Sequence, residues 1–175
     1  MRSVLATLAL ALVLLTVAAR TARADDDGKG EAGRPADKGV FGIGIILGEP
    51  TGITAKLYLR DDQAIDFAAG SAFAAGGLQV HSDYLFHPWI LQSRDSFVLP
   101  VYFGPGLRVI DYSGGSDGPS HVALGIRAVA GLLFDFKNVP LDAFVEVAGI
   151  GQYDFKSGNG WGLGFNGGAG VRYYF

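Results

Sequence analysis

Cysteine is absent from the sequence. The chain therefore has no disulfide framework, no thiolate metal site and no cysteine that a lipid anchor could modify. Basic residues are outnumbered by acidic ones, 14 against 17, and a mildly acidic chain is not a nucleic-acid binder by charge. Apolar residues at helical spacing are missing after residue 24, so period-two patterns carry most of the structural information.

Glycine and aromatic residues are abundant instead. The chain has 27 glycines, and Phe, Trp and Tyr make up 12% of its residues. Alternation of these types along strands suits a β-barrel, because glycine permits curvature and close packing while aromatic rings favour membrane interfaces. The composition therefore favours a barrel.

The first 24 residues have the features of a secretory signal peptide. A short charged start precedes an apolar run from Val4 to Ala19, and Ala22-Arg23-Ala24 forms a cleavage site. The alternative is a single anchor helix, but the run is shorter than the roughly 20 residues that a membrane span needs. We expect cleavage after Ala24, which removes three arginines and no acid and takes the formal charge from −3 to −6.

Residues 25–38, DDDGKGEAGRPADK, contain no apolar side chain larger than Ala. A segment of this composition cannot bury a core, so it is predicted to be a disordered polar leader. Residues 39–175 are then the only folded domain that the sequence predicts.

Eight segments with alternating apolar residues follow the leader. The predicted strands are Val40–Leu47, Gly52–Arg60, Ala64–Phe73, Leu78–His87, Phe97–Ile110, His121–Phe134, Leu141–Gln152 and Trp161–Phe175. Short turn-forming segments join most of them, which requires antiparallel neighbours. The segment Pro88–Ser96 is predicted to be a long connection on the periplasmic side. An even number of such strands predicts an all-β fold, an eight-stranded antiparallel up-and-down transmembrane β-barrel.

Charge separates the two faces of these strands. One face is apolar, aromatic, Gly or Pro apart from Ser71 and Ser82, and it carries no charge. The opposite face carries the ionisable residues Lys56, Asp66, His81, Asp83, Arg108, Arg127, Asp142, Glu146 and Arg172. A soluble barrel would turn the apolar face inward and the charged face outward, whereas a membrane barrel does the reverse.

Strand length and aromatic placement favour the membrane orientation. The last alternation, Trp161–Phe175, is far longer than the about five or six residues common in soluble strands. Aromatic residues gather at the strand ends expected on the periplasmic side, as an interfacial girdle does. The predicted girdle consists of Phe41, Tyr84, Phe86, Trp89 in the adjoining loop, Phe97 and Phe134.

The charges of the predicted lumen are balanced, with four basic residues and four acidic ones. Unpaired charge in a narrow interior is costly, so balance predicts internal pairing. We expect the pairs Arg172–Asp142 and Arg127–Glu146 on adjacent strands. Such a network would plug the barrel, whereas an ion-selective pore more often has charges of one sign around a constriction.

The signal peptide, the eight amphipathic strands and the terminal strand resemble small bacterial outer-membrane β-barrels of the OmpA/OmpX-like eight-stranded size class. In such proteins a C-terminal Phe with apolar residues at every second preceding position is read by the barrel-assembly machinery. The resemblance implies that this assembly signal is formed by Val171, Tyr173 and Phe175. Gly48–Ile53 also resembles a small family of such barrels with no assigned activity. The implied location is the bacterial outer membrane, with its lipid and the assembly machinery as partners.

Three groups of residues have side chains that could carry chemistry. His81-x-Asp83 offers two ligands and His87 is the only further histidine nearby, so a hydrogen-bonded pair is favoured over a metal site. Ser120-His121 resembles a nucleophile and its base, but no orienting acid adjoins it. Asp111–Ser120 has the residue types of a calcium loop without the spacing, and a surface loop is the simpler interpretation.

The sequence therefore predicts a small outer-membrane barrel protein, structural or porin-like. We expect a charge-paired plugged lumen, a monomer, and no catalysis, cofactor or metal. Two alternatives stay open. One is an outer-membrane enzyme that modifies lipid A through His121 or His81, and the other is a soluble periplasmic lipocalin-like barrel that binds a lipophilic ligand.

Overall fold

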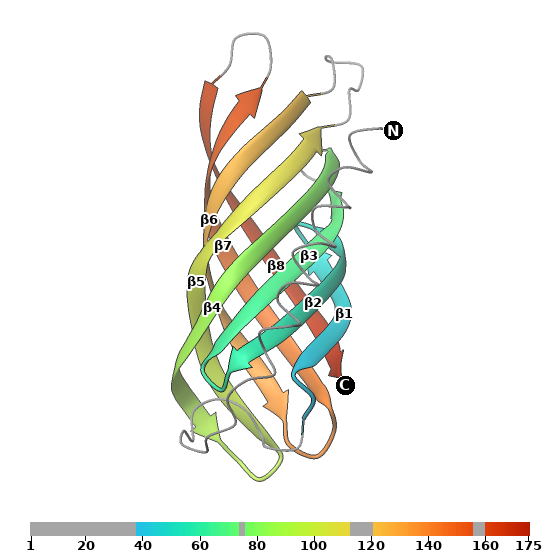
Figure 1. Cartoon of the computed structure of the whole chain (residues 1–175), viewed down its shortest axis with the longest axis vertical. Helices are drawn as coiled ribbons and strands as arrows, with labels where there is room; N and C mark the ends of the chain where they lie inside the picture. Colours follow the sequence, from blue (N-terminus) through green and yellow to red (C-terminus); the bar gives the residue numbers. More distant parts are fainter. Residues whose placement is uncertain (1–37, 74–75, 113–120, 156–159) are drawn as a thin grey trace.

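The computed structural model describes residues 38–73, 76–112, 121–155 and 160–175. The predicted signal peptide and all of the predicted leader except Lys38 lie outside these residues. Eight antiparallel strands form one closed sheet in sequence order, as Figure 1 shows. They are β1 (Phe41–Gly48), β2 (Thr51–Arg60), β3 (Gln63–Ala72), β4 (Gly77–Ser93), β5 (Phe97–Tyr112), β6 (His121–Phe136), β7 (Leu141–Phe155) and β8 (Gly160–Tyr174). The predicted all-β, up-and-down ring is confirmed.

No helix in the described part of the chain is long and apolar enough to cross a membrane.

Period-two alternation decides which side of the sheet each residue occupies. Leu124, Val145 and Val171 point outward and are 49%, 45% and 47% exposed. Arg127 and Glu146 point inward and are only 3% and 9% exposed. The charged face of the strands therefore lines the interior, and the apolar face forms the outer surface.

The connection between β4 and β5 differs from the prediction. β4 continues through Pro88 to Ser93, so the predicted long loop Pro88–Ser96 is wrong and Trp89 lies in a strand. The pairing of β4 with β5 shifts register between Phe86 and Trp89. Proline cannot donate to a β-ladder, but a bulge tolerates it, and Pro88 sits at this bulge.

Glycine permits one close approach inside the barrel. Tyr102 on β5 is fully buried and is paired with Gly131 on β6. A Cβ at Gly131 would lie 2.4 Å from the Tyr102 hydroxyl oxygen and 2.6 Å from the Val145 carbonyl oxygen. The tyrosine ring therefore occupies space that any other residue at position 131 would need.

The substitution Gly131→Ala should destabilise the barrel by about 1 to 3 kcal/mol, because it overpacks a filled interior. Gly149→Ala is the matched control, since the nearest atom to its added Cβ is a Phe165 ring carbon at 3.9 Å. The free energy of unfolding in urea measures both. A Gly131→Ala variant as stable as the Gly149→Ala variant would contradict the proposed packing.

Candidate functional site in the barrel interior

The first charged cluster is centred on Arg172 of β8, which is completely buried. Its Nη1 donates to Asp66 Oδ2 at 2.6 Å, and its Nε donates to Asp142 Oδ1 at 3.1 Å. The guanidinium also lies 4.0 Å from the centroid of the Phe144 ring. The predicted Arg172–Asp142 pair is present, and Asp66 on β3 joins it from across the barrel.

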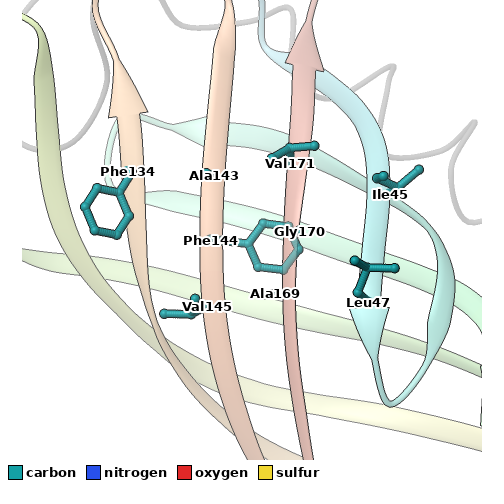
Figure 2. Close-up of a pocket in the computed structure, with 9 residues that line it drawn as sticks. All are labelled: Ile45, Leu47, Phe134, Ala143, Phe144, Val145, Ala169, Gly170 and Val171. Carbon is teal, nitrogen blue, oxygen red and sulfur yellow. The ribbon is translucent and has the colours of Figure 1, made fainter.

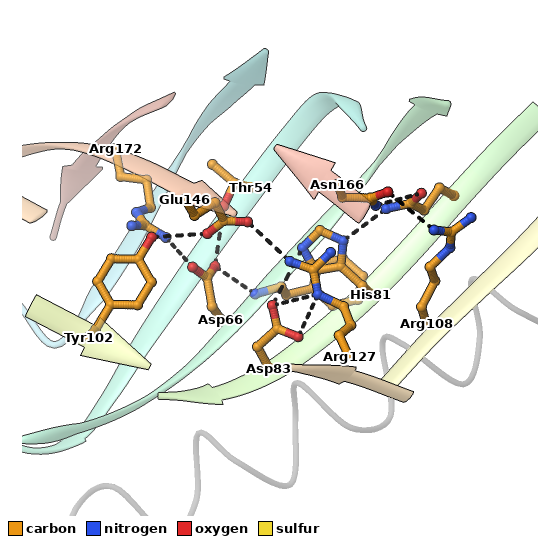
Figure 3. A network of polar contacts seen from close by, with 12 residues as sticks. Thr54, Asp66, His81, Asp83, Tyr102, Arg108, Arg127, Glu146, Asn166 and Arg172 are labelled. Atoms are coloured by element: carbon orange, nitrogen blue, oxygen red, sulfur yellow. Dashed lines mark hydrogen bonds and ion pairs between the residues drawn. The ribbon is translucent and has the colours of Figure 1, made fainter. Parts of the chain in front are cut away.

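The second cluster is centred on Arg127 of β6 (Figure 3). Its Nε donates to Asp83 Oδ1 at 2.9 Å, and its Nη2 donates to Glu146 Oε1 at 3.1 Å. The Tyr102 hydroxyl donates to the other oxygen of Glu146 at 3.0 Å. The predicted Arg127–Glu146 pair is therefore present, with Asp83 of β4 as an additional partner.

Pairing is not one to one, contrary to what equal numbers of charges suggested. Arg172 and Arg127 each form ion pairs with two of the four carboxylates. Lys56 and Arg108 form no ion pair with a carboxylate of the described residues. Lys56 Nζ lies 2.8 Å from His87 Nε2 and faces the rings of Tyr58 and Tyr102. Cation–π attraction offsets part of the cost of burying this ammonium.

Arg108 of β5 belongs to a chain of polar contacts nearer the end of the barrel at which β4 begins and β5 ends. Its Nη1 donates to Asn166 Oδ1 at 3.3 Å, and Asn166 Nδ2 donates to Gln79 Oε1 at 3.2 Å. Gln79 Nε2 in turn lies 3.3 Å from His81 Nδ1. Arg108 Nε has no hydrogen-bond partner in the structure as described.

His81 lies beside both carboxylates of the Arg127 cluster. Possible ligand atoms of His81, Asp83 and Glu146 all lie within 4.8 Å of one another. The Arg127 guanidinium already donates to both carboxylates, so a divalent cation there would face a fixed positive charge. His87, considered as a further ligand, contacts Lys56 instead. The geometry therefore does not favour a metal site. The predicted hydrogen bond between His81 and Asp83 is not formed either, because His81 Nε2 lies 3.8 Å from Asp83 Oδ2.

His121 begins β6, and its ring stacks on Tyr112 with centroids 4.7 Å apart. Ser120 and the rest of the predicted 111–120 loop, apart from Asp111 and Tyr112, lie outside the described residues. The serine–histidine pair considered from the sequence is therefore not described.

The aromatic residues predicted as a girdle occupy different positions along their strands. Phe97 and Phe134 contact each other near the β5 and β6 ends, with centroids 6.1 Å apart. Phe86 pairs with Phe103 within β5, so Tyr84 and Phe86 do not lie at the end of β4, which continues to Ser93. Phe41 begins β1. The residues of the predicted assembly signal point outward, with exposures of 47% for Val171, 47% for Tyr173 and 70% for Phe175.

The sequence interpretation missed several interior residues. Asp135 follows the predicted strand His121–Phe134 and Lys38 ends the predicted leader, but both are buried and form an ion pair. Tyr102 and Tyr174 donate to carboxylates of the two clusters. Tyr174 shares the parity of Arg172 along β8, so the alternation already assigns it to the inner face, and only its bond to Asp142 was not predicted.

No protein-family model, curated protein or solved structure matches the chain. Function must therefore be inferred from the interior and from the outer surface. The interior combines two arginine-centred ion clusters with an apolar group of buried side chains that includes Leu85, Leu133 and Phe144. This arrangement suits a filled interior better than a ligand cavity or a water-filled channel.

Proposed function

We propose that the protein is an outer-membrane β-barrel whose lumen is closed by a plug of paired charges, with a structural rather than catalytic task. The observation that carries this proposal is that the inner side of the sheet is charged and its outer side is apolar. Most charged residues of its strands are buried inside, and 27 large apolar side chains among the described residues are exposed. Soluble monomers rarely expose contiguous apolar patches above a few hundred Å². Hydrocarbon is the solvent that this surface fits.

The plug follows from the two arginine clusters. Arg172 links β8 to β3 and β7, and Arg127 links β6 to β4 and β7. Two of these ion pairs join adjacent strands, and the pairs with Asp83 and Asp66 reach strands two and three positions away in the ring. Separating these buried charges is costly, because a lone charge in a low-dielectric interior is less stable than in water by several kcal/mol. We therefore infer a barrel that does not conduct ions.

The alternatives fit the geometry less well. A lipocalin-like barrel needs an apolar cavity and a polar outer surface, whereas this interior carries charges and its outer face is apolar. A lipid A-modifying enzyme would need an accessible base. His81 is only 3% exposed and lies between Gln79 and Asp83. His121 lies at the rim, where its ring stacks on Tyr112.

The proposal extends to location and assembly. The first 24 residues would direct export and be removed, and Val171, Tyr173 and Phe175 would serve as the signal for the barrel-assembly machinery. The protein would then reside in the outer membrane as a monomer surrounded by lipid. Catalysis, a cofactor and a bound metal have no role in this proposal.

Fractionation and electrophoresis test the location. The protein should appear in the outer-membrane fraction and should migrate differently on a denaturing gel when it is not boiled, because a folded barrel resists detergent. In a planar lipid bilayer the purified protein should give no channel steps. A soluble periplasmic protein with no heat-dependent shift would refute the membrane assignment, and reproducible conductance would refute the plug.

A further inference from the structure

Strand β8 is longer than its neighbour β1. The two strands pair from Gly42–Tyr174 to Gly48–Gly168, where β1 ends. β8 continues to Gly160, and over that length it pairs only with β7. The Glu49 N–H donates to the Gly167 carbonyl at 2.9 Å and closes the last rung. Residues 160–166 therefore form an edge with no described strand beside it, here called the open edge.

The open edge presents unpaired backbone groups. Strand backbone groups alternate in direction, and the Gly167 carbonyl points toward β1. The N–H and C=O groups of Trp161, Leu163 and Phe165 therefore point the same way, where no described strand receives them. Sheet edges do not face hydrocarbon without a polar partner, because lipid tails offer no hydrogen bonds. Some polar group should therefore occupy this side of β8.

The outer face of the same residues is strongly apolar. Trp161, Leu163 and Phe165 are 80%, 94% and 88% exposed, the highest values among the large apolar side chains of the described residues. The open edge thus combines a need for hydrogen bonds along the backbone with a need for hydrocarbon around the side chains. An amphiphile meets both needs, whereas water alone or lipid tails alone meet only one.

A positive charge lies on the inner side of the open edge. Asn166 is its last inward-facing residue, and its side-chain oxygen accepts from Arg108 Nη1. Arg108 is buried and forms no ion pair with a described carboxylate, but it interacts with the Tyr112 side chain and with the charge of Glu49 in the β1–β2 turn. A Cβ added at Gly164 would meet no heavy atom within 4 Å. The inner side of the edge is therefore open in front of Gly164 and favours an anion.

An apolar groove lies on the outer surface beyond the open edge, along the part of β8 that pairs with β1. It has a volume of about 380 Å³. Figure 2 shows its walls, which come from β1, β6, β7 and β8 and include Ile45, Leu47, Phe134, Val145 and Val171. Its floor contains Ala169 and Gly170, a few residues along β8 from Asn166. A hydrocarbon chain that begins at the open edge can continue into this groove.

We infer that the open edge, Arg108 and the groove form one site for a membrane lipid with an anionic headgroup. The headgroup would lie at the open edge, accept hydrogen bonds from the backbone N–H groups there, and interact with Arg108. The acyl chain would lie along β8 in the groove. This inference rests on the proposed membrane location. A second copy of the chain is a poorer occupant, because neighbouring copies in one membrane share an orientation and their tilted β8 strands would cross rather than pair.

The two tryptophans of the sequence provide the test. The substitution Trp89→Phe leaves Trp161, in the open edge, as the only tryptophan. The protein is reconstituted in phosphatidylcholine vesicles that contain brominated phosphatidylglycerol or, at equal mole fraction, brominated phosphatidylcholine. Bromine quenches tryptophan on contact. The relative binding constant from quenching should be about tenfold higher for the anionic lipid, the effect of one charge-assisted contact.

Two further variants identify the site. Arg108→Gln should abolish the preference for phosphatidylglycerol. Gly164→Leu fills the open space, and its Cβ meets no heavy atom within 4 Å. This variant should also abolish the preference for phosphatidylglycerol. It keeps the test valid if the Arg108 variant does not fold. Ala130→Leu, at an exposed outward position of β6, is the matched control and should retain the preference.

Each outcome supports or overturns the assignment. Equal quenching by the two lipids, or a preference that survives both Arg108→Gln and Gly164→Leu, would overturn it. Weak quenching by either lipid together with a doubled mass in detergent would assign the edge to a second copy and overturn it as well. A protein that never enters the vesicles and lacks the heat-dependent gel shift would refute the membrane location itself, so the two failures are distinguishable.

Discussion

Replacing Arg172 by methionine should lower the free energy of unfolding by about 3 to 5 kcal/mol, the range for breaking a buried ion pair from one side. Arg172 has no exposed surface and donates to Asp66 and Asp142. Methionine fills much of the volume but leaves two carboxylates buried and close together without a cation. Equilibrium unfolding in urea, followed by tryptophan fluorescence in lipid vesicles, measures the loss.

Two companion variants separate charge from volume. Arg60→Met changes an exposed arginine at the end of β2 and should alter stability by no more than about 0.5 kcal/mol. Adding Asp66→Asn and Asp142→Asn to Arg172→Met removes the uncompensated charges and should recover part of the loss. If Arg172→Met were as stable as Arg60→Met, the cluster would not hold the barrel walls together.

The sequence predicted the strands and their faces well, because alternation is a local property. The alternation of residues along each strand, together with the order of neighbouring strands, was enough to derive the eight segments, the charged inner face and both expected ion pairs. Asp66 could not be assigned to Arg172, since these residues are 106 positions apart and lie on β3 and β8. Their contact depends on how the sheet closes and on its stagger, which no local pattern contains.

Strand ends were predicted less well, because turn-forming residues can also lie within strands. Pro88 suggested a loop, although a bulge accommodates it inside β4. The alternation predicts that the strand beginning at His121 ends at Phe134, although β6 continues to Phe136 and buries Asp135 against Lys38. The mismatch that creates the open edge arises instead from the lengths of β1 and β8 themselves, which the predicted ranges Val40–Leu47 and Trp161–Phe175 already contained.

The substitution Val147→Arg distinguishes a membrane barrel from a soluble one. Val147 lies next to the centre of β7, points outward and is 65% exposed. In water an arginine at such a position should change the free energy of unfolding by no more than about 0.5 kcal/mol. In a bilayer the same arginine faces hydrocarbon, where it should destabilise a barrel by about 2 to 4 kcal/mol. Unfolding by urea in lipid vesicles gives the value.

The matched control places the same substitution outside the predicted membrane span. Val139 lies in the turn between β6 and β7 and is 44% exposed. Its replacement by arginine should change stability by about 0.5 kcal/mol or less, because a turn at the membrane surface leaves the charge in water. The difference between the two variants therefore measures the environment of β7 rather than a general effect of arginine. Equal effects at positions 147 and 139 would mean that the apolar outer surface does not face lipid.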